Sequence, residues 1–213
     1  MKDLLIDLDN TVYPEDSKIF SQIDFRMKSF ISLHLNLSFD EAYDLQKKYF
    51  LKHGTTLRGL MMYHNINPDE FLKYVHDIDL GCIKENQDLK KRLQNYKGKK
   101  IIFTNGTLEH AQNVLKRMRL DKYIDFIFDI VDATFIPKPN IITYEKVISK
   151  YDLDIKRTVM IDDIPNNLKT AKKLGIKTSL ISKNKDTYQK YDYIDIVTKN
   201  LLDTLIKIDN GEI

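Results

Sequence analysis

The 213-residue sequence contains no tryptophan and only 1 cysteine, 5 prolines and 7 glycines. The single cysteine, Cys82, excludes an internal disulfide framework and is typical of a reducing compartment. So few glycines and prolines leave no flexible linker and no low-complexity segment. No apolar run is long enough to span a bilayer, and the start, Met1-Lys2-Asp3, carries no apolar signal segment. These absences predict a cytoplasmic globular protein.

A strong charge of either sign is also missing. The 34 basic and 31 acidic residues leave a net charge of +3, and we interpret the small excess of lysine as solvated surface. Nothing resembles the arginine-rich or aromatic-interleaved stripe of a nucleic-acid-binding protein. We therefore expect a small-molecule substrate, with no nucleic-acid polymer, no membrane and no obligate protein partner.

The order of the apolar patterns predicts an α/β protein in two parts. A first strand at 4–6 is followed, from about 15 to 86, by apolar residues at helical spacing without any strand pattern. We interpret residues 15–86 as an inserted helical cap domain of about four helices. Further strands are expected at 100–104, 126–131, 158–161, 177–181 and 193–197, with helices between them. This alternation predicts a doubly wound parallel sheet in a core domain of residues 1–14 and 87–213.

Polar side chains stand at the ends of the predicted strands or in the loops that follow. They are Asp7 with Asp9, Thr104 with Asn105 and Gly106, Lys138, and Asp162 with Asp163. The carboxyl ends of parallel strands meet at one edge of the sheet, where open α/β proteins bind their ligands. Four carboxylates at that edge suit a hard cation such as Mg²⁺ better than zinc, which prefers histidine and thiolate. The sequence therefore predicts a magnesium site.

Magnesium beside carboxylates favours phosphoryl transfer. Asp7 would attack phosphorus and form an aspartyl phosphate. Asp9, two residues on, lies on the same side of an extended backbone, where it would protonate the leaving oxygen and later deprotonate water. Thr104 and the backbone amides of Asn105 and Gly106 would hold phosphate oxygens. We therefore expect a magnesium-dependent phosphomonoesterase.

The four motifs together resemble those of the haloacid dehalogenase-like hydrolase superfamily over essentially the whole chain. This resemblance implies a Rossmann-like core with the helical insert as a lid. It implies that Asp7 is nucleophile and metal ligand, and that Asp9 is the acid/base with its carbonyl oxygen on Mg²⁺. Thr104 would stabilise the phosphoryl group, and Lys138 would pair with that group and with Asp7. The pair Asp162-Asp163 would bind the metal, the second acid directly or through water.

A narrower resemblance is to the pyrimidine 5′-nucleotidase branch of that superfamily. It rests on Asp9–Pro14, Gly54–Leu60, Val75–Asp77, Phe103–Gly106, and on Asp162-Asp163 followed by Asn167, Ala171 and Gly175. Ile164 departs from the branch, which usually has serine there. The branch implies hydrolysis of UMP or CMP. The alternative is a phosphatase or mutase that acts on a sugar phosphate or a cofactor-precursor phosphate.

Arg58 is the candidate substrate-binding residue of the cap. It lies in a glycine-flanked turn, from which a guanidinium would reach a substrate group. A bond that only stabilises the cap fits the same position equally well. His53, His64 and His76 are interpreted as structural.

Two other functions share parts of the pattern. A dehalogenase of the same fold also uses an aspartate nucleophile, but it needs neither Asp9 nor the pair Asp162-Asp163. A receiver-like signalling module also gathers acids, a threonine and a lysine at strand ends. That module has no helical insert after its first strand, so the segment 15–86 argues against it.

Overall fold

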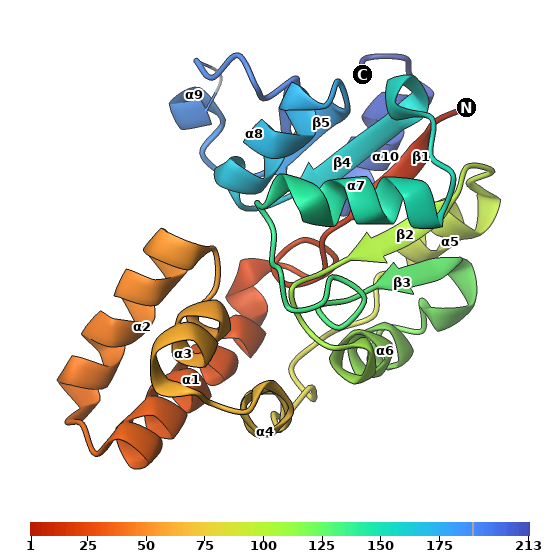
Figure 1. Ribbon diagram of the computed structural model, residues 1–213. Coiled ribbons are helices and arrows are strands. Elements are labelled where there is room, and N and C mark those ends of the chain that lie inside the picture. Colours follow the sequence, from red (N-terminus) through yellow and green to blue (C-terminus); the bar gives the residue numbers. More distant parts are fainter. Residues whose placement is uncertain (189) are drawn as a thin grey trace.

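The computed structural model describes residues 1–188 and 190–213. Within these residues, six parallel strands form one sheet in the order β3-β2-β1-β4-β5-β6 (Figure 1). The strands are β1 (Asp3–Ile6), β2 (Lys100–Phe103), β3 (Phe126–Phe128), β4 (Thr158–Asp162), β5 (Lys177–Ile181) and β6 (Ile196–Thr198). The predicted fold class, a doubly wound parallel sheet with a helical cap after the first strand, is confirmed. The strand order reverses direction between β1 and β4, which makes their ends the switch point of the sheet.

Helices cover both faces of the sheet (Figure 1). On one face α5 (Gln87–Asn95) contacts α10 (Leu201–Asp209), and on the other α7 (Ile141–Lys150) contacts α8 (Pro165–Lys173). The other core helices are α6 (Leu108–Arg117), the short α9 (Lys185–Tyr188), and the 3-10 turns η2 (Asp121–Tyr123) and η3 (Ile155–Arg157). Right-handed crossovers that run in opposite directions along a sheet place their helices on opposite faces. The central strands are consequently buried, β2 and β4 along their whole lengths.

The cap consists of four helices between β1 and α5. The turn η1 (Glu15–Ser17) leads to α1 (Ile19–Leu35), α2 (Phe39–His53), α3 (Thr56–His64) and α4 (Pro68–Val75). Ser38 and Glu41 form a capping box at the start of α2, and the Asn67 side chain accepts two backbone N–H bonds at the start of α4. The cap helices stand beyond the carboxyl ends of the central strands (Figure 1). The domain limits at residues 15 and 86 stay a prediction.

Two strands differ from their predicted limits by more than one residue. The third strand ends at Phe128 rather than at residue 131, because the Asp129 carboxylate accepts the N–H groups of Leu108, Val131 and Asp132 and turns the chain there. The last strand begins at Ile196 rather than at residue 193. Within the described ranges, no helix combines the length and the apolar character that crossing a bilayer requires.

Candidate active site

The switch point of the sheet brings Asp7 and Asp162 together. The strands β1 and β4 are neighbours, and the Asp7 N–H donates to the Ile161 carbonyl at 2.9 Å. Asp162 is fully buried and accepts the Ile164 N–H at 2.8 Å and the Asn167 side-chain amide at 3.0 Å. The Ile164 bond comes from the backbone, so the departure from serine at this position leaves it in place.

Lys138 lies between these two carboxylates. Its Nζ donates to Asp7 Oδ1 at 2.7 Å, to Asp162 Oδ2 at 2.9 Å and to the Phe103 carbonyl at 2.7 Å. Burial by itself would lower the pKa of Lys138, but the charges of Asp162 and Asp7 outweigh it and hold the pKa above its usual range. The ammonium is therefore a permanent positive charge at the strand ends.

Asn105 positions the lysine loop. Its side-chain amide donates to the Lys138 carbonyl at 3.3 Å, and its Oδ1 accepts the Lys138 N–H at 2.9 Å. The sequence predicts a phosphate contact for the backbone amide of Asn105. The Asn105 side chain lines the pocket at the strand ends and at the same time fixes the backbone that carries Lys138.

Asp7, Asp162 and Asp163 form an acidic triad. One carboxylate oxygen from each lies within 4.8 Å of the others, close enough to share a metal ion. Burial is the main cause of the raised pKa of both Asp7 and Asp163. The charge of Lys138 opposes the increase at both, more strongly at Asp7, and repulsion from neighbouring carboxylates adds to it. One ammonium therefore does not neutralise the three acids, and the residual negative charge and oxygen-only donor set fit a divalent cation.

Thr104 and Gly106 lie beside the triad at the end of β2. The Thr104 side chain is 2% exposed, and its Oγ1 accepts the Gly106 N–H at 2.9 Å. The amide that was expected to hold a phosphate oxygen is thus engaged by Thr104. Because Oγ1 accepts that bond, its own hydrogen remains available for a substrate oxygen.

Asp9 is held by two residues that the sequence pattern did not indicate. Its Oδ1 accepts the Tyr13 hydroxyl at 2.6 Å and the ring Nε2 of His110 at 2.8 Å. Burial alone would raise the pKa of Asp9, but His110 and Tyr13 outweigh burial and lower it to about 2. The signal that could have revealed this contact is a histidine among the apolar residues on the core face of α6.

The cap histidines have separate surroundings. His76 follows α4, lines the catalytic pocket, and stacks on His110 with ring centroids 4.3 Å apart and planes 7° apart. His64 Nε2 lies 2.6 Å from the Tyr49 hydroxyl within the cap. His53 lines a neighbouring hollow. Of the three, only His76 faces the catalytic groups.

The catalytic pocket is a hollow of about 370 Å³ between the cap and the strand ends. Its floor carries Asp7, Asp9, Thr104, Lys138 and Asp163. Its cap wall is mainly apolar and includes Ile23, Met27, Phe50, Phe71 and Val75. A phosphate at the floor would therefore direct the rest of a substrate toward an apolar wall.

Arg58 lies outside this pocket, in an adjoining hollow of about 590 Å³. The two hollows share five lining residues, which are Phe50, Gly54, Asn105, Ile164 and Asn167. A role of Arg58 toward substrate consequently stays a prediction, and it requires a substrate that extends past these shared residues.

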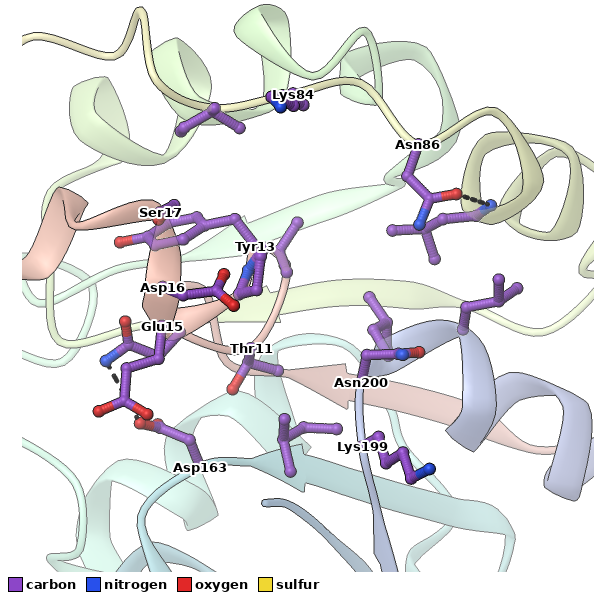
Figure 2. A pocket seen from close by; sticks show the side chains of 18 of the residues that line it. Thr11, Tyr13, Glu15, Asp16, Ser17, Lys84, Asn86, Asp163, Lys199 and Asn200 are labelled. Carbon is purple, nitrogen blue, oxygen red and sulfur yellow. Dashed lines mark hydrogen bonds between the residues drawn. The ribbon is translucent and has the colours of Figure 1, made fainter. Parts of the chain in front are cut away.

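A third hollow, of about 1060 Å³, lies behind the segment 10–17 (Figure 2). Asn10, Glu15 and Asp163 line both this hollow and the catalytic pocket. The Asn10 side-chain amide donates to Asp163 Oδ2 at 3.5 Å. The segment 10–17, which follows Asp9, thus separates the two hollows.

Comparison with known proteins gives the family. The haloacid dehalogenase-like hydrolase family matches residues 1–175. The chain is 28% identical over 217 residues to phosphate metabolism protein 8 of Saccharomyces cerevisiae. The matched region covers 93% of this chain and 66% of the yeast protein. The chain therefore spans slightly less than two thirds of that relative. It is 26% identical over 234 residues to a glyceraldehyde 3-phosphate phosphatase of Methanocaldococcus jannaschii, which covers 98% of this chain and 96% of that protein.

Solved structures share the fold. The structure of a HAD phosphatase from Thermococcus onnurineus has a TM-score of 0.63 at 18% identity and covers 99% of this chain and 97% of that one. The L-2-haloacid dehalogenase of Xanthobacter autotrophicus has a TM-score of 0.62 at 13% identity and covers 99% of both chains. The family match over most of the chain, with the motif residues gathered at one sheet edge, leads to one conclusion: the chain belongs to the haloacid dehalogenase-like hydrolase family.

Proposed function

We propose that this protein is a magnesium-dependent phosphomonoesterase that acts on small phosphate esters. The observation that carries the proposal is the acidic triad, Asp7, Asp162 and Asp163, with Lys138 bonded to two of its members. A hard cation and a lysine side by side bind and polarise a phosphate. When bound, Mg²⁺ would neutralise the charge between an anionic nucleophile and an anionic ester.

The residues support a reaction in two steps. An Asp7 oxygen forms a bond to phosphorus while the ester P–O bond breaks, and the departing alkoxide takes a proton from Asp9. Asp9 then takes a proton from water, whose oxygen attacks the aspartyl phosphate and releases inorganic phosphate and the Asp7 carboxylate. The Thr104 hydroxyl and the Lys138 ammonium bind the transferred phosphoryl group in both steps.

The same geometry argues against dehalogenation, although dehalogenases share the fold. Halide leaves without a proton, so that reaction gives no role to a bonded acid at position 9. A carbon-centred displacement by one aspartate also gives no role to Asp162 and Asp163 as metal ligands. Both features have a role in phosphate ester hydrolysis.

For the substrate, we favour a small sugar phosphate or cofactor-precursor phosphate. Support comes from the similarity, over nearly the full length of both chains, to a phosphatase named for glyceraldehyde 3-phosphate. A pyrimidine nucleoside 5′-monophosphate, UMP or CMP, is the second candidate. The apolar cap wall with Phe50 and Phe71 supports it, because such a wall suits a planar base.

A substrate panel tests the proposal. Turnover of p-nitrophenyl phosphate, sugar phosphates, cofactor-precursor phosphates and nucleoside monophosphates is compared with Mg²⁺ and after chelation with EDTA. We expect activity that depends on Mg²⁺ and a higher kcat/KM for a sugar phosphate than for UMP or CMP. Absence of turnover on every ester by folded protein would refute the phosphatase. A preference for UMP and CMP would reverse the order of the two substrate classes.

A further inference from the structure

We infer that His110 and Tyr13 are positioning residues that orient Asp9 so that one of its oxygens is reserved for proton transfer. This inference rests on the proposed phosphomonoesterase function. His110 lies outside the motifs that carry the nucleophile, the lysine and the metal ligands, and Tyr13, although it is part of the stretch Asp9–Pro14, has no role assigned by the sequence.

Both hydrogen bonds arrive at the same oxygen. The Tyr13 hydroxyl and the His110 ring both donate to Asp9 Oδ1, at 2.6 Å and 2.8 Å. Oδ1 accepts both bonds whether Asp9 is ionised or carries its proton on Oδ2, so the hydrogen in the second bond is on His110 Nε2. In the part of the chain that the structure describes, Asp9 Oδ2 receives no hydrogen bond, and Asp9 lines the catalytic pocket. The oxygen without a donor is therefore the one left for a leaving group or water.

The two donors are themselves held rigidly. His110 is 2% exposed and Tyr13 is fully buried. The His110 backbone lies in the first turn of α6, where its N–H donates to the Thr107 side chain at 3.2 Å and the Asp129 carboxylate accepts the Leu108 N–H at 2.8 Å. Fixed donors hold the Asp9 carboxylate in one rotamer, which is what a proton carrier within hydrogen-bond reach of its partner requires.

The cap contributes to the same arrangement. His76, just after α4, stacks on the outer face of the His110 ring, and its Nδ1 lies 3.3 Å from the Thr107 hydroxyl. The ring that orients Asp9 is thus covered by a cap residue. The stack and the Asp9 bond are separable features of His110, and substitutions can remove one without the other.

The position of Asp9 should affect turnover to an extent that depends on the leaving group. An alkoxide must take a proton from Asp9 as the P–O bond breaks, whereas p-nitrophenolate leaves without one. The ratio kcat/KM reports the steps up to departure of the alcohol. A misplaced Asp9 should therefore lower kcat/KM for alkyl phosphates far more than for p-nitrophenyl phosphate.

Two substitutions of His110 separate its roles. His110→Phe keeps a ring to stack on His76 and removes the donor, while His110→Gln keeps an amide donor at similar reach and removes the ring. With Mg²⁺, we expect His110→Phe to lower kcat/KM for glycerol phosphate about 30-fold and for p-nitrophenyl phosphate by less than about 3-fold. The first loss is smaller than the roughly 10²–10⁴-fold that general acid catalysis supplies, because Asp9 itself remains in the variant. We expect His110→Gln to recover most of the loss.

Tyr13→Phe is an independent test of how Asp9 is oriented, and it has a matched control. It removes the second donor and should produce the same leaving-group dependence to a smaller extent. Tyr96→Phe removes a hydroxyl bond of 2.7 Å to the Lys2 carbonyl, remote from the site, and should leave both kcat/KM values unchanged. Thermal unfolding of each variant measures any general loss of stability.

The outcomes decide between positioning and packing. Equal losses on both esters in His110→Phe, or a larger loss in His110→Gln than in His110→Phe, would overturn the inference in favour of a packing role for the ring. Wild-type rates in His110→Phe and Tyr13→Phe would overturn it as well. If the wild-type protein hydrolysed neither ester, the proposed function would fail before the variants were compared, so the two failures are distinguishable.

Discussion

Lys138→Met is the substitution whose effect the structure specifies most closely. The Lys138 side chain is 1% exposed and donates to two carboxylates, at 2.7 Å and 2.9 Å. At an effective dielectric constant of about 20, each pair corresponds to about 6 kcal/mol of Coulomb attraction, most of it offset by desolvation. Removal of one partner leaves Asp7 and Asp162 buried and unneutralised, and breaking a buried pair in this way costs about 3–5 kcal/mol. We expect a decrease of that size in the free energy of unfolding without metal.

Mg²⁺ should reverse much of this loss. A divalent cation neutralises the carboxylates that the lysine leaves behind, and a ligand that binds only the folded state stabilises it by mass action. Urea unfolding of wild type and Lys138→Met is therefore compared in EDTA and in Mg²⁺. The variant should gain more stability from Mg²⁺ than wild type gains, while its turnover stays abolished.

Lys100→Met is the matched control. Lys100, at the start of β2 and away from the triad, is also buried, with 7% exposed. Its Nζ lies 3.0 Å from Asp125 Oδ2. Its loss should destabilise the protein to the same extent with and without Mg²⁺. If Lys138→Met were as stable as wild type in EDTA, or if Mg²⁺ stabilised both variants equally, the assignment of the triad as a cation site neutralised by Lys138 would be wrong.

Three further predictions concern single side chains. Asp7→Asn should abolish turnover of p-nitrophenyl phosphate while circular dichroism and unfolding show an intact fold, and near-normal activity would exclude Asp7 as nucleophile. Arg58→Ala should change the ratio of kcat/KM between natural esters by about tenfold with little effect on p-nitrophenyl phosphate, because Arg58 adjoins the pocket rather than lining it. An equal loss of kcat/KM on all esters would indicate a structural role. Asp195→Asn should lower stability at pH 7, by an amount that decreases as the pH falls below the ordinary range of an aspartate pKa, measured by urea unfolding. Burial by itself would raise the pKa of Asp195, but hydrogen bonds from Lys172 and from the Thr178 N–H outweigh burial and lower it. The stabilisation is therefore present above the unfolded-state pKa and is lost as the pH falls through the folded-state pKa. A difference in unfolding free energy between wild type and variant that stays constant with pH would contradict this.

Local sequence patterns were sufficient for the fold class. Runs such as Leu4-Leu5-Ile6 have no polar face, so they fit only a strand covered on both sides, and the helical periodicity of 15–86 fits no strand. Strand limits were less predictable because they depend on side chains that act across the chain. Asp129, for example, ends β3 by accepting the backbone N–H of Leu108, at the start of α6, as well as that of its own neighbour Val131.

The sequence alone was sufficient to select the groups that we propose carry the chemistry. Asp7, Asp9, Thr104, Lys138 and the pair Asp162-Asp163 follow from residue types at strand ends, because parallel strands place all their carboxyl ends on one edge. No knowledge of strand order was needed for that inference.

The family resemblance already implied that Lys138 pairs with Asp7, but only the tertiary structure decided the other contacts of these groups. The adjacency of β1 and β4 sets Lys138 between Asp7 and Asp162, and it brings Asp163 within reach of a shared cation. The fold of α6 against the loop after β1 brings His110 to Asp9 across 101 residues of sequence, and it leaves Arg58 outside the catalytic pocket. Contacts between residues so far apart depend on strand order and helix packing, which are properties of the whole chain rather than of any local pattern.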